Sequence, residues 1–464
     1  MLIAAGAGAA LAGLGALVLG RRPRGVAGWN EAFFVGGALA AALLFPFSLV
    51  LGPFALLALA TGVAATGVPG LVVACLRPSV GGPAQAAGRP GTLEVLLGAW
   101  IALAFVAFSV ANFRYHLLWD GLHIWATKAM LLVDDGCLSP VLWGGGGLEG
   151  RVGRVAAYPP FVPLLEAFVA TVRGSFDFDA VKPVFILFYA SLLVGTWSAG
   201  QSLGGRRAGL LAAALVAALP PLSTRWAAGG YADMPQAAAL VALAGALLRC
   251  EDAGPAWRRP APWLLGAVVS VKSEGTILAL VALGGCFGAA ALAGGVRGVA
   301  RVVRREAGGF VVAAAFLAQR FAYSRWTSAF KDLEHRSVNA ESLVAAIGRV
   351  PEVARLVLAE MSDVPKWGFL WPALAAASAL LLVRGDAPRR ALTLATLAAV
   401  ALYSSTFLFT NWPVAVHVAT ALDRILSQLA PAAVLVVVAA LLPRSAGSAD
   451  RREDDAAAPP SGAP

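Results

Sequence analysis

The sequence predicts an all-α protein that crosses a membrane many times. Hydrophobic residues fill 59% of the 464 positions and charged residues only 13%, and the mean hydropathy is +0.75. A soluble domain carries about 25% charged residues. Apolar runs of about 20 residues, the length of a bilayer-spanning helix, recur along the whole chain. The composition therefore indicates a polytopic membrane protein.

About thirteen membrane spans are expected, and the first is a retained helix. Residues 1–20 have no basic segment before the apolar run, and Arg21, Arg22 and Arg24 follow it, so the pattern differs from that of a signal peptide. The predicted spans are 2–20, 29–51, 54–75, 92–112, 181–200, 208–223, 231–248, 261–272, 275–294, 308–324, 367–383, 391–409 and 425–443.

The arginines predict the orientation of these spans. Short loops rich in Lys and Arg usually face the cytoplasm. Applying this rule places residues 113–180, 224–230, 325–366 and 410–424 outside. The formal net charge of +10 then reflects cytoplasmic loops, and we expect no nucleic-acid partner. The loops assigned to the cytoplasm contain Arg21/Arg22/Arg24, Arg77/Arg89, Arg206/Arg207, Arg249/Arg258/Arg259, Arg297/Arg301/Arg304/Arg305 and Arg384/Arg389/Arg390.

One apolar segment, at 158–170, does not fit a simple span. It is short, contains Pro159, Pro160, Pro163 and Glu166, and would invert every later loop if it crossed the membrane. We interpret it as a juxtamembrane or re-entrant helix on the outer side. The polar tail 444–464, rich in Pro, Ala and Ser, is expected to be a disordered cytoplasmic end.

The two long outer loops each predict an amphipathic helix. In 113–180, one face carries Leu122, Trp125, Ala129, Leu132 and Val133, whereas His123, Lys128 and Asp134 point elsewhere, which suits an interfacial helix. In 325–366, Asn339 is a plausible N-cap and Pro351 is expected to break the helix in two. The glycines at 144–147 lack the Lys-Ser/Thr of a phosphate-binding loop.

Polar residues form five clusters on the predicted outer side. Charges near the membrane core are costly, so they usually face a cavity with a function. The clusters are Trp119-Asp120 with its neighbours, Tyr158 with Glu166, Tyr231 with Asp233, Lys272 with Glu274, and His417 with Asp423-Arg424. Simpler roles are open for each: Asp120 and Asp233 as helix caps, Lys272 and Glu274 as a structural ion pair, His417 as an interfacial side chain, and Arg424 as an anchor at the start of the last helix.

The order of these clusters resembles a family of membrane enzymes. Trp119-Asp120…Trp125…Lys128-Ala129, Tyr158-Pro-Pro-Phe-Val-Pro-Leu, Tyr231-Ala-Asp233-Met-Pro, Lys272-Ser-Glu274-Gly275 and Ala421-Leu-Asp423-Arg424…Gln428-Leu-Ala-Pro431 follow one another as in GT-C glycosyltransferases. The similar branch contains aminoarabinose lipid A transferases, protein O-mannosyltransferases and rhizobial galacturonosyltransferases. The resemblance runs from about Phe113 to Pro431. It divides the chain into additional N-terminal helices (1–91), a catalytic core (92–443) and the tail.

The resemblance implies transfer of a sugar from a polyprenyl-phosphate donor to a lipid, glycan or protein acceptor outside a bacterial inner membrane. It implies Asp120 as the base and Asp233 as a second catalytic carboxylate. The residue chemistry agrees, because transfer to a hydroxyl needs a proton acceptor and a leaving phosphate needs cations. Lys128, Tyr158, Lys272, Glu274, His417 and Arg424 are the expected substrate-binding residues.

No metal or other cofactor is expected to be tightly held, because the histidines and the four cysteines show no ligand spacing. A divalent cation between Asp120 and Asp233 stays open. Two other functions also stay open. A transporter for a lipid-linked saccharide would carry polar residues at mid-membrane depth and two related halves. A non-catalytic scaffold of an envelope-polysaccharide complex would tolerate loss of Asp120, Asp233 or Arg424.

Overall fold

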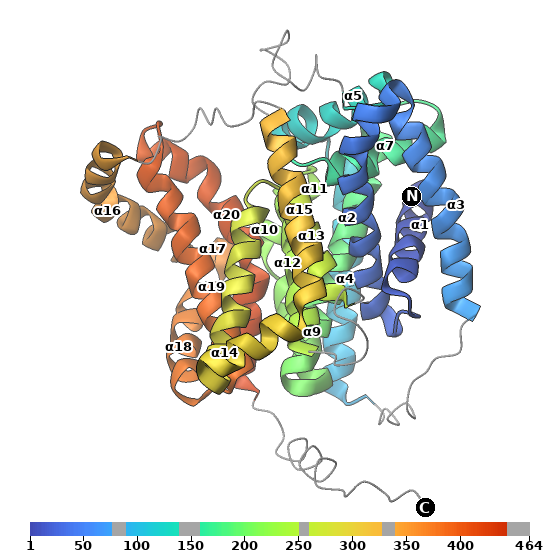
Figure 1. The fold of residues 1–464 in the computed structure, drawn as a ribbon. Helices are drawn as coiled ribbons and strands as arrows, with labels where there is room; N and C mark the ends of the chain where they lie inside the picture. The colour runs from blue at the N-terminus through green and yellow to red at the C-terminus, as the bar shows by residue number, and fades with distance from the viewer. Residues whose placement is uncertain (77–89, 139–157, 250–258, 327–338, 443–464) are drawn as a thin grey trace, which may run out of the picture.

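In the computed structural model the chain is a bundle of long apolar helices. The structure describes residues 1–76, 90–138, 158–249, 259–326 and 339–442. The glycine run at 144–147 and the tail 444–464 lie outside these residues. Figure 1 shows α5 and α7 at one end of the bundle, which we call the site end, and the junction of α14 with α15 at the other, which we call the arginine end.

The first part of the bundle is formed by α1 (Leu2–Leu19), α2 (Gly25–Leu51), α3 (Ala55–Leu76) and α4 (Thr92–Arg114), with the short turn η1 (Gly52–Phe54) between α2 and α3. Glycines hold α1, α2 and α3 close together. A Cβ on Gly13 would collide with the backbone carbonyl of Gly67, and a Cβ on Gly36 would collide with that of Leu11. Only glycine therefore allows the helices to approach this closely. Such small-residue contacts are a common way of packing helices in a membrane.

The site end is built from short helices. They are the π-helical segment η2 (Gly121–Ala126), α5 (Thr127–Asp135), α7 (Phe161–Arg173), α8 (Phe178–Val181), α10 (Pro220–Ser223), α11 (Arg225–Ala228) and α17 (Val364–Trp367). The predicted juxtamembrane segment is α7, which packs against α5, α1 and α2.

The central helices position the site. They are α9 (Pro183–Ala217), α12 (Asp233–Arg249), α13 (Pro260–Val271), α14 (Gly275–Arg305) and α15 (Ala307–Trp326), followed by α16 (Ala340–Met361), α18 (Leu370–Arg384), α19 (Ala387–Thr406), the 3-10 turn η4 (Phe407–Phe409) and α20 (Val414–Leu441). Helix α12 packs along α9, α13 and α20. Non-helical backbone at Gly204–Gly205 and Gly294–Gly295 divides α9 and α14.

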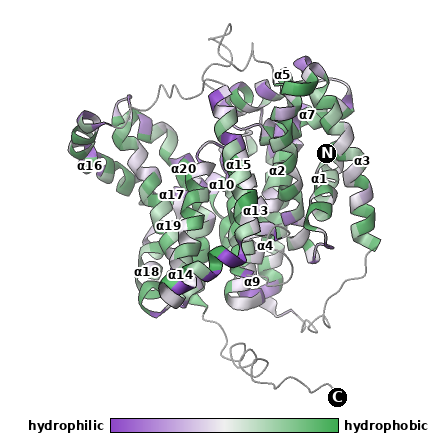
Figure 2. Cartoon of the chain, viewed as in Figure 1, coloured by the Kyte–Doolittle hydropathy of each residue, from purple (hydrophilic) through white to green (hydrophobic). Residues whose placement is uncertain are grey.

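Seven segments of the described chain are long and apolar enough to cross a membrane, and α13 and α18 are shorter apolar helices. One of the seven, Gly25–Leu76, contains both α2 and α3. Figure 2 shows hydrophobic residues over most of the bundle and hydrophilic residues mainly at helix ends and along the distal part of α14. The all-α membrane fold is thus confirmed, whereas the number of thirteen spans stays a prediction.

Three sequence expectations are wrong. Helix α20 begins at Val414, so 410–424 is no outer loop and Arg424 lies inside the helix. Helix α16 continues through Pro351, although Asn339 caps it by accepting a 2.8 Å hydrogen bond from the Ser342 amide. Lys128 is fully buried, on the same side of α5 as Ala129 and Leu132.

Candidate functional site

Asp120 is brought to Asp233 by a close backbone contact between η2 and the turn before α12. The Leu118 amide donates to the Gly229 carbonyl over 2.9 Å. A Cβ on Gly121 would collide with that carbonyl, and Gly230 has a φ of 88°, which favours glycine. These glycines place the carboxyl of Asp120 beside the first turn of α12, where Asp233 lies.

Lys272 is delivered by the turn between α13 and α14. The Gly275 amide donates to the Lys272 carbonyl over 3.0 Å, and a Cβ on Gly275 would collide with the Val268 carbonyl, so the turn is tight. The Lys272 ammonium lies 2.8 Å from Asp233 Oδ1 and 2.9 Å from Glu274 Oε1. The predicted Lys272–Glu274 ion pair therefore exists, and it is also joined to α12.

Arg424 on α20 bridges the two aspartates. Its Nη2 donates to Asp120 Oδ2, and its Nε donates to Asp233 Oδ2 over 3.2 Å. The guanidinium also lies over the Tyr231 ring, 4.5 Å from the centroid, which is a cation–π distance. Arg424 thus has a role beyond anchoring the last helix at the membrane surface.

Gln428 completes the ligands of Asp233. One helical turn beyond Arg424, its Nε2 donates to Asp233 Oδ1 over 2.7 Å. The Tyr403 hydroxyl lies 3.2 Å from Gln428 Oε1 and 3.3 Å from the Glu274 carbonyl. We call the set of Asp120, Asp233, Lys272, Glu274, Arg424 and Gln428 the charged cluster.

Exposure differs across the charged cluster. The side chains of Asp233 and Lys272 are 6% and 4% exposed, whereas those of Asp120, Arg424 and Glu274 are 14%, 20% and 27% exposed. The buried pair therefore forms the base of the cluster, and the other three side chains present its reachable face. A small cavity lined by Trp226, Tyr231, Asp423 and Arg424, among others, adjoins this face.

Asp120 is not a helix cap by its side chain, because no capping hydrogen bond forms at the start of η2. Burial raises the pKa of Asp120, and the neighbouring Arg424 opposes this rise by favouring the charged carboxylate. The carboxyl is thus a stronger proton acceptor than an ordinary aspartate while it still lies beside a cation.

Lys128 and Tyr158 lie in a neighbouring contact. The Lys128 ammonium donates to the Tyr158 carbonyl over 2.8 Å and lies 5.7 Å from the centroid of its ring. Burial, followed by the charge of Arg320, lowers the pKa of Lys128 well below its usual value. Tyr158 interacts electrostatically with Lys272 and Arg424, so its phenol is close to the charged cluster.

His417 and Glu166 lie in other surroundings. His417 is on α20, two turns before Arg424; its Nδ1 lies 2.7 Å from Thr410 Oγ1, and its ring packs against Phe407 and Trp412. Glu166 is fully buried in α7, where its carboxyl has no hydrogen-bond partner among the described residues. Burial raises its pKa well above the ordinary value, which favours the neutral acid.

Three further residues, Arg320, Tyr403 and Gln428, contact the site although no role for them is predicted from the sequence. Arg320 donates to Ser273 Oγ over 3.0 Å, inside the Lys272–Glu274 turn. The position of Arg320 could have indicated this contact, because an arginine within the apolar run 308–324 is expected to face protein or a cavity. Gln428 is part of the motif that begins at Ala421. It lies four residues after Arg424, a spacing that places both side chains on one face of a helix.

Comparisons with known proteins identify the fold. No protein-family model matches the chain, and no curated protein matches it. Among solved structures, ArnT from Cupriavidus metallidurans bound to undecaprenyl phosphate has a TM-score of 0.50 at 17% identity, over 78% of this chain and 63% of that one. The chain has a GT-C fold. It spans less than two thirds of the length of ArnT.

An archaeal structure also matches. The oligosaccharyltransferase of Archaeoglobus fulgidus in complex with Zn and sulfate has a TM-score of 0.48 at 14% identity, over 75% of this chain and 48% of that one. The GT-C architecture expected from the order of the motifs is thus confirmed by the likeness to ArnT, and the roles of the individual site residues stay predictions.

Replacing Asp233 with alanine is expected to destabilise the protein strongly. The change leaves the buried Lys272 and the Arg424 guanidinium without a shared counter-charge, a loss of about 3–5 kcal/mol for a buried pair. Thermal unfolding in detergent measures the effect. Asp134→Ala, which alters an exposed aspartate on α5, is the control. Equal melting temperatures for the two variants would show that the charged cluster contributes little to stability.

Proposed function

We propose that the protein is a membrane glycosyltransferase that moves a sugar from a polyprenyl-phosphate donor to a hydroxyl of an acceptor. The observation that carries the proposal is the bridge formed by Arg424 between Asp120 and Asp233. It holds a carboxylate and a cation side by side at one reachable face, which supports their roles as base and phosphate ligand. The GT-C fold, and the undecaprenyl phosphate bound by the ArnT neighbour, support the lipid-linked donor.

In the proposed reaction Asp120 accepts the proton of the acceptor hydroxyl. The hydroxyl oxygen forms a bond to the anomeric carbon of the sugar while the bond from that carbon to the phosphate oxygen breaks. The polyprenyl phosphate leaves with the electron pair, and attack from the opposite face inverts the configuration. A base in this position is worth about 10²–10⁴-fold in rate.

Arg424 is the proposed ligand of the donor phosphate. Its guanidinium can hold phosphate oxygens through parallel hydrogen bonds. It is also more exposed than Lys272, which supports the cluster from its buried base by balancing Asp233. We propose that an arriving phosphate competes with Asp120 for the guanidinium, so that donor binding releases the carboxylate to act as base. Tyr158 and Glu274 are proposed to contact the sugar.

The proposed setting is a bacterial inner membrane, with the site end on the extracytoplasmic side. The positive-inside assignment supports this orientation, because Arg249, Arg259 and Arg305 lie at the opposite end. The acceptor would then be a lipid, glycan or protein reached from the extracytoplasmic side.

Asp120→Asn is expected to lower the transfer rate by about 10²–10⁴-fold, because the amide cannot accept the proton. Transfer from polyprenyl-phosphate sugars by purified protein in detergent is the measurement. Asp134→Asn should retain full activity, and both variants should elute as folded protein. Normal turnover by Asp120→Asn would remove its assignment as base. Substrate movement that needs sealed vesicles, without transfer in detergent, would indicate a transporter.

The pH profile is expected to show an acidic limb set by Asp120. A base acts when deprotonated, so kcat/KM falls as the pH drops through its pKa. Since burial raises this pKa above 3.8, the fall should begin at higher pH than for an ordinary aspartate. The residual activity of Asp120→Asn should lack this limb. An unchanged limb in the variant would assign it to another group.

Transfer is expected to persist in a metal chelator. The Arg424 guanidinium already lies between Asp120 and Asp233 and supplies the positive charge that a divalent cation would otherwise supply there. Activity measured with excess EDTA, compared with activity after adding back Mg²⁺ or Mn²⁺, tests this. A loss that either ion restores would show that a metal takes part.

A further inference from the structure

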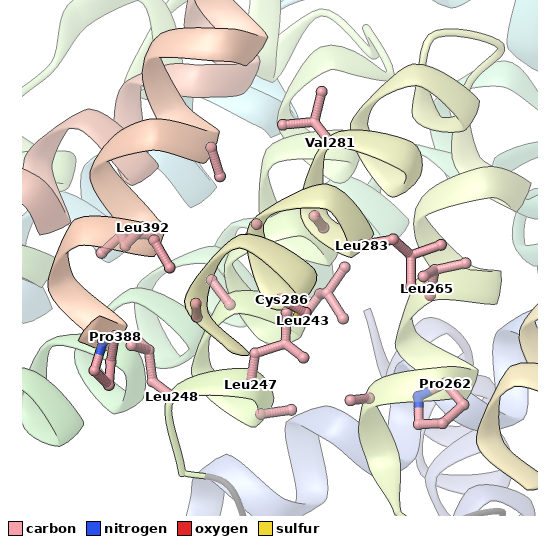
Figure 3. Close-up of a pocket in the computed structure, with 18 of the residues that line it drawn as sticks. Leu243, Leu247, Leu248, Pro262, Leu265, Val281, Leu283, Cys286, Pro388 and Leu392 are labelled. Atoms are coloured by element: carbon pink, nitrogen blue, oxygen red, sulfur yellow. The ribbon is translucent and has the colours of Figure 1, made fainter. Parts of the chain in front are cut away.

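A large apolar cavity lies between the helices below the charged cluster. Its volume is about 530 Å³, within the range of small-molecule pockets, and its walls come from α12, α13, α14, α15, α19 and α20. Figure 3 shows Leu243 and Leu247 of α12, Leu265 of α13 and Leu392 of α19 around this space. An aliphatic chain is the ligand that such walls would accommodate.

One layer of side chains, which includes Glu274 and Gln428 of the charged cluster, lies between the cavity and the rest of that cluster. The residues of this layer do not line the cavity. At the end of the cavity nearest the site end, each lining residue lies one helical turn farther from the site end than a residue of this layer. The lining residues Leu240, Leu278 and Ala432 come four positions after Gln236, Glu274 and Gln428, and Ala399 comes four positions before Tyr403. None of the described residues that line the cavity at this end is charged.

The charged lining residues all lie at the arginine end. They are Arg249, Arg259, Arg305 and Glu306. Arg249 pairs with Glu31, and Arg259 and Arg305 both pair with Glu306. The distance from Arg305 Nε to Glu306 Oε1 is 2.9 Å. Three guanidinium groups and two carboxylates thus gather at this end among the residues that the structure describes.

The distal part of α14 extends this basic surface. After the non-helical Gly294–Gly295, where Gly295 has a φ of 56°, the helix runs across the arginine end, as Figure 1 shows. This part carries Arg297, Arg301 and Arg304, which are exposed, ahead of Arg305. Basic residues in such a position attract anionic headgroups of the adjacent leaflet.

We propose that the cavity binds an acyl chain of an anionic glycerophospholipid from the leaflet at the arginine end. The headgroup phosphate lies against Arg259 and Arg305, and the chain points toward the charged cluster. This orientation is opposite to that of a donor whose phosphate reaches Arg424. The charged lining residues lie only at the arginine end of the cavity. Because an amphiphile aligns its headgroup with such charges, this arrangement favours the phospholipid orientation over the orientation of the donor. The predicted topology makes this leaflet the cytoplasmic one.

Filling the cavity tests the site. Ala289 lines it, whereas Ala291 on the same helix is exposed and does not. Ala289→Trp is expected to abolish retention of one phospholipid per protein, measured by native mass spectrometry from nanodiscs of mixed phosphatidylglycerol and phosphatidylethanolamine. Ala291→Trp should retain it. Equal retention by the two folded variants would overturn the site.

The headgroup assignment is tested separately. Arg305→Gln removes a lining charge, and Arg301→Gln removes an exposed charge one turn away. Arg305→Gln is expected to weaken phosphatidylglycerol retention about fivefold, the effect of one basic residue at an anionic surface. Arg301→Gln should have a smaller effect. Equal retention of phosphatidylethanolamine by wild type, or a polyprenyl phosphate found in the cavity instead, would overturn the proposal.

Discussion

The buried carboxylate of Asp233 is the group on which the site depends. Its two oxygens accept hydrogen bonds from Lys272, Gln428 and Arg424, which come from the α13–α14 turn and from α20. A carboxylate in an apolar bundle is stable only when its charge is balanced and its lone pairs are filled. The requirement therefore fixes the start of α12 and the α13–α14 turn relative to the middle of α20, and Arg424 extends the constraint to Asp120.

The same requirement limits how the site can change when a ligand binds. An anion that took Arg424 from both aspartates would leave Asp233 dependent on Lys272 and Gln428 alone. An anion that displaces only Asp120 leaves Asp233 balanced, and it frees the more exposed carboxylate. Release of Asp120 is thus the smaller perturbation, which is why the proposed reaction assigns proton transfer to Asp120 and positioning to Asp233.

The sequence predicted the apolar helices well because a continuous run of apolar residues is a local pattern. The prediction of helix bounds was wrong where polar residues interrupt such a run. Residues 414–424 contain His417, Asp423 and Arg424, so the start of α20 resembled a polar loop, although these side chains are satisfied by neighbouring elements. The predicted direction of Lys128 was wrong because a lysine was expected to point away from the apolar face. In α5 it lies one turn before Leu132, and its ammonium donates to the Tyr158 carbonyl.

The sequence also predicted that Asp120, Asp233, Lys272, Glu274 and Arg424 lie on one side of the membrane. Apart from the Lys272–Glu274 pair, it did not predict which of them are in contact. Asp120 and Arg424 are 304 positions apart, and their contact depends on Gly121 and Gly230 allowing two backbones to meet. Nothing local distinguishes a glycine needed for such an approach from the many that relieve packing elsewhere. The separation of the two proposed lipid sites has the same origin. The layer of Gln236, Glu274, Tyr403 and Gln428 comes from α12, the start of α14, α19 and α20, and it lies between the apolar cavity and the rest of the charged cluster.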